Sequence, residues 1–250
     1  MADDARSSRR AVASLNVSMF FSMLQYCLTL ISEPMLMQEA CGGDLAATAA
    51  ALGSTSAVSA LVGVVVNQFG GQASDASGRK RFLLAGPAAC IATNLLVLRL
   101  PHHLPTILAC RVARTAMTGL SSTVMVTASL SDLYSGMELA VANSKLMRTI
   151  GIGLIVAQWS EATLLERWKL PTLAFYASLI SSAAHLLCNW LFIPETLPPS
   201  QRTSGVSLRS LNPLGFLAVF TRGSWALKKL VMITAIQSSE QTLQHNQAAS

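Results

Sequence analysis

Long apolar runs alternate with short polar segments along the chain. Roughly 18 or more consecutive residues with few charges are typical of a helix that crosses a membrane. The runs that reach or approach this length cover residues 11–32, 45–69, 82–99, 104–131, 141–163 and 172–193. The pattern therefore predicts an all-α fold, a polytopic membrane helical bundle with six transmembrane helices.

Prolines support most of these boundaries. A proline near a helix end costs little, because the backbone N–H that it lacks would be unpaired there. Five prolines lie at or near the ends of the apolar runs: Pro34, Pro101, Pro105, Pro171 and Pro194. Pro87 instead lies inside a predicted span. A kink is tolerated there if a neighbouring helix satisfies the carbonyl that the proline frees.

The composition agrees with a membrane protein. Hydrophobic residues make up 52% of the chain and charged residues 12%, whereas an average soluble domain is about 25% charged. A net charge of +6 is also common in nucleic-acid-binding proteins, but no basic stretch is interleaved with aromatic residues. We therefore expect the lipid bilayer, and not nucleic acid, to surround this chain.

The Lys and Arg residues also predict an orientation. The side shared by the N-terminus and the segments 70–81 and 132–148 is rich in basic residues, whereas the opposite side has only Arg99, Arg167 and Lys169. Since cytoplasmic loops carry an excess of Lys and Arg, the first side is expected to be cytoplasmic. The chain is thus predicted to be an integral, multi-pass membrane protein with a cytoplasmic N-terminus.

Four regions follow from this assignment. Residues 1–10 form a cytoplasmic tail, 11–193 the six-helix bundle, 194–229 a cytoplasmic linker, and 230–250 a seventh apolar segment that ends early in a polar tail. Two explanations of this last region stay open. The chain is either a truncated product or a half that pairs with another chain.

The polar segment between the second and third spans has a distinctive pattern. It reads GGQASDASGRKR and contains the spacing G-x-x-x-D-x-x-G-R-K, formed by Gly71, Asp75, Gly78, Arg79 and Lys80. This spacing, at this place in the topology, resembles the loop between spans two and three of the major facilitator superfamily. The chain is therefore similar to the N-terminal six-helix half of such a transporter.

Three weaker matches point to the same family. Arg111 and Arg114 resemble its R-x-x-Q/R stretch in span four, Asp132 resembles the acidic residue that ends that span, and Pro194-Glu195-Thr196 resembles the turn after span six. The sequence GIGLIVAQW in span five lacks the glycine-proline signature of many drug/proton antiporters. An antiporter is therefore not favoured.

The resemblance implies a gate at this segment. The aspartate matching Asp75 meets a helix end in the other half of such carriers, and Arg79 would pair with Asp132. From the residues alone, Gly70 and Gly71 permit close helix approach and Gly78 permits a positive φ. The gating residues are then Gly71, Asp75, Gly78, Arg79, Lys80 and Asp132. The alternative is a solvated loop that only signals orientation.

Polar residues within the spans are candidates for a solute pathway, because ionisable groups in a membrane usually mark functional sites. The candidates are Asn16, Gln25, Tyr26, Arg111, Arg114, Thr118, Gln158, His185 and Asn189. Two alternatives stay open: the arginines could snorkel to the interface, and the polar groups could serve helix packing. His185 could carry a proton near neutral pH, although a buried histidine is more often a packing residue.

The predicted function is transport of a small solute by alternating access. The chain has no G-x-S-x-G, H-E-x-x-H or phosphate-loop motif, so we expect no enzyme, no cofactor and no metal site. The expected partners are the bilayer, a small-molecule solute, and a second six-helix half or another copy. The alternative function is that of a transport-inactive six-helix scaffold or regulator of a full-length relative.

Overall fold

The computed structural model describes residues 2–198, 200, 202, 224–225, 228–229 and 232, with side chains from Arg10 onward. The chain divides into two compact units, Met1–Val206 and Ser207–Ser250. The following description concerns the first unit. Most of the predicted linker and of the early-ending seventh segment lies outside the described residues.

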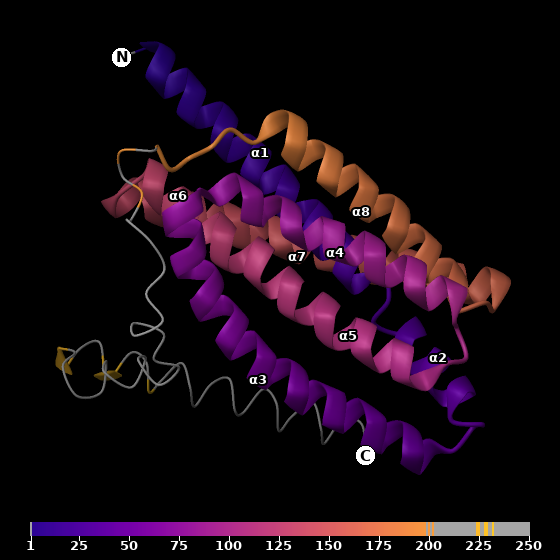
Figure 1. The fold of residues 1–250 in the computed structure, drawn as a ribbon. Coiled ribbons are helices and arrows are strands. Elements are labelled where there is room, and N and C mark those ends of the chain that lie inside the picture. The colour runs from indigo at the N-terminus through magenta and orange to yellow at the C-terminus, as the bar shows by residue number, and fades with distance from the viewer. Residues whose placement is uncertain are drawn as a thin grey trace. The chain divides into compact units, whose positions relative to one another are not determined.

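The described residues form helices and no strand (Figure 1). The α-helices are α1 (Ala2–Cys27), α2 (Ser32–Ala40), α3 (Leu45–Ser77), α4 (Arg79–Arg99), α5 (Leu104–Gly119), α6 (Met125–Leu133), α7 (Gly136–Trp168) and α8 (Thr172–Phe192), and a π-helix, η1 (Leu120–Val124), joins α5 to α6. Within the described ranges, five segments are long and apolar enough to cross a membrane, one being α1 and α2 together. The predicted span 104–131 corresponds to α5, η1 and α6. The predicted all-α membrane bundle is confirmed.

Three predicted spans have other boundaries in the structure. The fifth, predicted over 141–163, is the helix α7, Gly136–Trp168. The first span does not end at residue 32, because a turn at residues 28–31 is followed by α2, where Pro34 occupies the first turn. The second span continues to Ser77, so the predicted loop 70–81 is helical except at Gly78. The polar residues there are compatible with a helix, because the hydroxyls of Ser74 and Ser77 donate hydrogen bonds to backbone carbonyls of their own helix.

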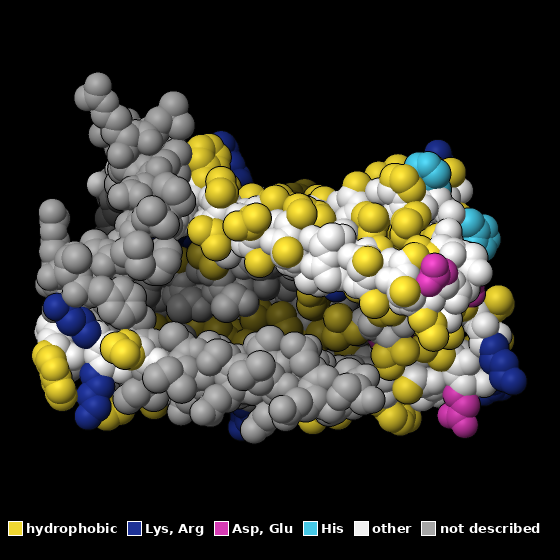
Figure 2. All heavy atoms as spheres, turned by 90° about the horizontal axis from the view of Figure 1, so that it is seen from below, with side chains coloured by type: hydrophobic (Ala, Val, Ile, Leu, Met, Phe, Trp, Pro, Cys, Tyr) yellow, Lys and Arg dark blue, Asp and Glu magenta, His cyan; other side chains and the backbone are white. Residues whose placement is uncertain are grey.

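The helices pack as a series in which each touches the next: α3, α5, α4, α8, α1 and α7. Only 17% of the most apolar window is buried in α3 and in α7, the two ends of this series. Figure 2 shows hydrophobic side chains over the middle of one face of the bundle, with acidic, basic and histidine side chains at its right-hand end. This distribution suits a bundle whose middle faces lipid.

The π-helix η1 packs against α3 and α4, and each of these helices has a glycine at the contact. A Cβ at Gly86 would overlap the side chain of Ser121, and one at Gly70 would overlap that of Leu120. Close approach is therefore the reason for glycine at both positions. The expectation of close packing at Gly71 was wrong, because a Cβ there would meet open space.

The carbonyl that Pro87 leaves without a partner in α4 is bound by a side chain of α8. Proline at position 87 removes the N–H that would bond to the carbonyl of Leu83, one turn earlier. The side-chain amide of Asn189 donates a hydrogen bond to this carbonyl at 2.8 Å, and Asn189 is 1% exposed. A neighbouring helix thus provides the hydrogen bond that the carbonyl of Leu83 needs, which was the condition for a proline inside this span. Asn189 therefore has a structural role.

This pairing predicts a double-mutant effect. Asn189→Leu should lower the free energy of unfolding by roughly 1–2 kcal/mol, because the Leu83 carbonyl loses its donor. Pro87→Ala restores an N–H within α4, so Asn189→Leu should cost less in that background. Denaturant unfolding of the purified protein in mixed micelles measures both costs. An equal cost in the two backgrounds would contradict the assignment.

Candidate functional site

A network of ion pairs, the Arg79 network, joins the ends of α3, α4 and α6. The Arg79 guanidinium contacts the carboxylate of Asp75 at 2.5 Å and that of Asp132 at 3.1 Å. It also donates to the hydroxyl of Ser74 at 2.6 Å. The Arg79 side chain is only 10% exposed, whereas that of Asp75 is 42% exposed. Arg79 is therefore fixed inside the network, and Asp75 can also meet another group.

Glu195 closes the same network from the segment after α8. Its carboxylate accepts hydrogen bonds from the backbone N–H groups of Arg79 (2.8 Å) and Lys80 (3.4 Å). A carboxylate at a helix N-terminus satisfies unpaired donors and the helix dipole. Gly78 has φ +102° and lies against Glu195. Glu195 belongs to the Pro-Glu-Thr turn noted in the sequence. The sequence did not predict that this turn contacts the start of α4.

The six predicted gating residues do not all come together. Asp75, Arg79 and Asp132 are in direct contact, and Gly78 forms the break between α3 and α4. The amine of Lys80 instead donates to the carbonyl of Trp190 at 2.9 Å. Gly71 lies in α3, one helical turn before Asp75, with open space beside it.

A second network, the Glu33 cluster, lies within the bundle. The carboxylate of Glu33 receives the guanidinium of Arg114 at 2.6 Å and that of Arg111 at 2.9 Å. The side chains of Glu33 and Arg114 are 4% and 2% exposed, whereas Arg111 is 22% exposed. The predicted pathway residues Arg111 and Arg114 are therefore brought together by Glu33, which directly follows the predicted span 11–32 and was not among the candidate residues.

Hydrogen bonds extend the Glu33 cluster across the bundle. Arg114 donates to the amide oxygen of Asn94 at 3.4 Å, and Asn94 donates to Ser178 at 2.9 Å. The Ser178 hydroxyl donates to the backbone carbonyl of Gln25 at 2.6 Å. Side chains from α2, α4, α5 and α8 and a carbonyl of α1 thus form one connected network.

The Glu33 cluster has an excess of positive charge. Two guanidinium groups share one carboxylate, and the Nε of Arg114 has no hydrogen-bond partner among the described atoms. Both polar atoms of the Gln25 side chain are likewise buried without a described partner. Unpaired buried polar groups are costly unless something binds them. The cluster is therefore chemically suited to receive an anion that also accepts hydrogen bonds.

Glu161 holds the break in the first span. Its side chain, on α7, is 0% exposed. The carboxylate accepts hydrogen bonds from the backbone N–H groups of Ile31 (3.0 Å) and Ser32 (2.7 Å), at the start of α2. Glu161 lies near the end of the predicted span 141–163 and was not among the candidate residues. Its position directly after the charge-free run 149–160 was the available signal.

The remaining pathway candidates are separate from the Glu33 cluster. Asn16 accepts a weak bond from Thr149 at 3.5 Å, and Thr118 contacts Cys90. Tyr26 is half-buried, whereas Gln158 is exposed on α7. We therefore find no continuous line of the predicted polar residues in the described part of the bundle.

His185 belongs to the packing contact between α1 and α8. Its Nε2 lies 3.0 Å from the Ser18 hydroxyl and 3.2 Å from the Asn189 amide nitrogen. An amide N–H2 group can only donate, so this contact requires Nε2 to be an acceptor and the imidazole to be neutral. The contacts favour the packing role over the proton-carrying role for this histidine.

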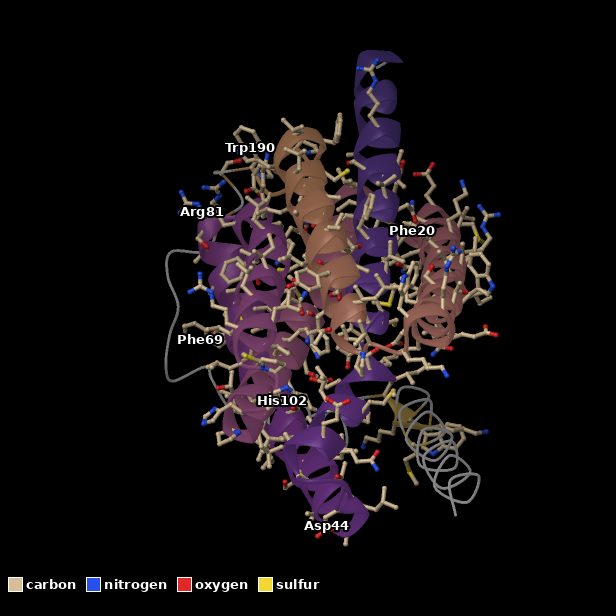
Figure 3. The ribbon with its side chains drawn as sticks, turned by 90° about the vertical axis from the view of Figure 1, so that its right-hand side faces the viewer. Phe20, Asp44, Phe69, Arg81, His102 and Trp190 are labelled. Atoms are coloured by element: carbon tan, nitrogen blue, oxygen red, sulfur yellow. The ribbon has the colours of Figure 1, made fainter. Side chains whose placement is uncertain are left out.

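Metal binding has no support among the residues described, where no three His, Cys, Asp or Glu side chains form a group that could hold an ion. His102 and His103, which follow α4, are both exposed. Figure 3 shows His102 and Asp44 towards one end of the bundle, with Arg81 and Trp190 towards the other.

Comparisons with known proteins agree on one family. The family model described as Major Facilitator Superfamily matches residues 11–242. The structure is similar to that of the human organic anion transporter MFSD10 (TETRAN), with a TM-score of 0.66, 20% identity, and coverage of 82% of this chain and 52% of that one. It is also similar to the peptide transporter POT in complex with sulfate, with a TM-score of 0.62, 14% identity, and coverage of 92% and 47%.

At these identities the likeness to solved structures shows a shared fold. The chain spans about half the length of each of these transporters. The comparison with curated protein sequences finds no significant match.

The Glu33 cluster predicts a large stability effect. Glu33→Gln leaves two guanidinium groups without their carboxylate, and breaking a buried ion pair costs about 3–5 kcal/mol. Glu39→Gln is the matched control, because Glu39 lies in the same helix and is exposed, so it should change the free energy of unfolding by less than about 0.5 kcal/mol. Denaturant unfolding in mixed micelles measures both. Similar values for the two variants would contradict the assigned burial.

Proposed function

We propose that this chain, which belongs to the major facilitator superfamily, carries a small organic anion across a membrane by alternating access. It is an integral, multi-pass membrane protein. The observation that carries the proposal is the Glu33 cluster, in which Glu33, Arg111 and Arg114 lie inside an apolar bundle. Charges at such a position are costly and typically belong to substrate or ion pathways.

The charge of the cluster supports an anionic solute. Its two guanidinium groups and one carboxylate sum to one positive charge. Arg111 is the member with the largest exposed fraction, 22%, and its planar donors suit a carboxylate or sulfonate. The human relative in the structural comparison is an organic anion transporter. Arg111 is therefore the proposed contact for solute, while Arg114 positions Glu33.

The Arg79 network is the proposed gate. Alternating access requires one bundle to move relative to another, so contacts at one end must form and break. Arg79 is held by Asp132 and Ser74, and Asp75 remains 42% exposed. Asp75 would then meet the second half of a complete carrier, whether in the same polypeptide or in another copy. The excess of Lys and Arg at this end supports its cytoplasmic location.

Uptake into proteoliposomes tests the transport proposal. A complete carrier that contains this chain as one of its two halves should, after reconstitution, accumulate radiolabelled aromatic and aliphatic carboxylates above the level of empty vesicles, but not their uncharged amides. Arg111→Gln should lower carboxylate uptake about tenfold or more, because a charge-assisted hydrogen bond is lost. Arg167→Gln, at the exposed end of α7, is the control and should not lower it. Uptake of no carboxylate would contradict the proposal and favour the scaffold alternative.

The gate has its own prediction. Asp75→Asn should impair uptake without reducing membrane insertion, and exchanging the charges of Arg79 and Asp132 should recover part of what either single reversal loses. Glu138→Gln is the matched control, since Glu138 is an exposed acidic residue in the first turn of α7. Normal uptake by Asp75→Asn would show that the residue is not a gate.

A further inference from the structure

An apolar groove runs between α4 and α8, away from both charged networks. Its volume is about 470 Å³, within the range of ordinary ligand pockets, roughly 300–1,000 Å³. The lining residues are Leu84 and Ile91 from α4 and Ala183, Leu186, Leu187 and Trp190 from α8. The groove thus offers an elongated hydrocarbon surface on the outside of the bundle.

One end of this groove is basic. Arg81 lies three residues before Leu84 in α4, so the two side chains share a helix face. Arg81 is exposed, and it makes no hydrogen bond or ion pair with the described residues. Lys80 lies beside it, with its amine on the carbonyl of Trp190 at 2.9 Å. Figure 3 shows Arg81 and Trp190 at the same end of the bundle.

The nearby acidic groups do not neutralise Arg81. Asp75 and Asp132 both bind Arg79, and Glu195 binds the backbone at the start of α4 and approaches Arg202 at 3.8 Å. The positive charge of Arg81 is therefore available to a ligand at one end of the apolar groove. Trp190, which is 62% exposed, has the amphipathic ring that favours the membrane–water interface.

We propose that this groove binds an anionic glycerophospholipid. One acyl chain lies along α4 and α8, and the phosphate is held by Arg81 at the interface beside Trp190. Two features select this occupant. A free phosphate would not use the hydrocarbon surface, and a zwitterionic lipid would bring its own ammonium group to the basic end. The anionic lipids of the cytoplasmic leaflet are attracted to such basic positions, which agrees with the orientation predicted from the Lys and Arg residues.

Native mass spectrometry of the purified full chain tests the site. The protein, in a neutral detergent, is titrated separately with dioleoyl phosphatidylglycerol and with dioleoyl phosphatidylcholine, which have identical acyl chains. We expect tighter binding of phosphatidylglycerol. Arg81→Gln should weaken that binding about fivefold and leave phosphatidylcholine binding unchanged, since one basic residue near a charged lipid surface contributes a factor of this size.

Two further variants separate the groove from general charge. Ala183→Phe fills the groove, and because Ala183 is exposed the larger ring need not disturb the core. It should weaken the binding of both lipids several-fold. Arg99→Gln removes an exposed arginine from the opposite end of α4 and should leave binding unchanged. Far-UV circular dichroism and elution volume show whether each variant keeps its fold.

Three results would overturn the proposal. The first is equal affinity for the two lipids. The second is unchanged phosphatidylglycerol binding in folded Arg81→Gln or Ala183→Phe. The third is a change of oligomeric state in Ala183→Phe without a change in lipid binding, which would assign the groove to contact between copies.

Discussion

A bilayer offers no water to a polar group that lacks a partner, and this constraint decides where the polar residues of the bundle lie. The clearest cases are two backbone interruptions. The first span breaks before α2, and Glu161 from α7 binds the backbone N–H groups of Ile31 and Ser32, which the break leaves without a helical partner. Pro87 frees the carbonyl of Leu83, and Asn189 from α8 binds it. In both cases a side chain far away in sequence permits an irregular backbone at membrane depth.

The break before α2 also joins two carboxylates with different tasks. Glu161 binds the backbone at the start of α2, whereas Glu33, the second residue of this helix, binds Arg111 and Arg114 in α5. The position of α2 therefore depends on contacts from both α7 and α5. A solute that competes with Glu33 for Arg111 would loosen one of these two attachments while the other holds. If the cluster binds the proposed solute, α2 would be the element through which that binding alters the first span.

The charge-free runs predicted the class of fold, because they are local signals, whereas the contact between Arg79 and Asp132 was implied by the resemblance to the family. Sequence reasoning failed where polarity alone was used to infer a loop. Residues 70–77 are helical since their hydroxyls bond within the helix and Asp75 pairs with Arg79 one turn later. It also missed Glu33 and Glu161 as interior groups. Their partners are about 80 and 130 residues away, and no local periodicity specifies which helix supplies them.

The two charged networks share one helix. α4 begins in the Arg79 network and provides Asn94 to the Glu33 cluster, with Gly86 and Pro87 between them. Coupling between distant sites requires an element with two arrangements that both sites influence. α4 meets the structural part of this requirement, because the carbonyl that Pro87 leaves free in it is held by one hydrogen bond from Asn189 and its close approach to η1 depends on Gly86. A change in angle at Pro87 would move Asn94 relative to Arg79, and so connect solute contact to the proposed gate within a single helix.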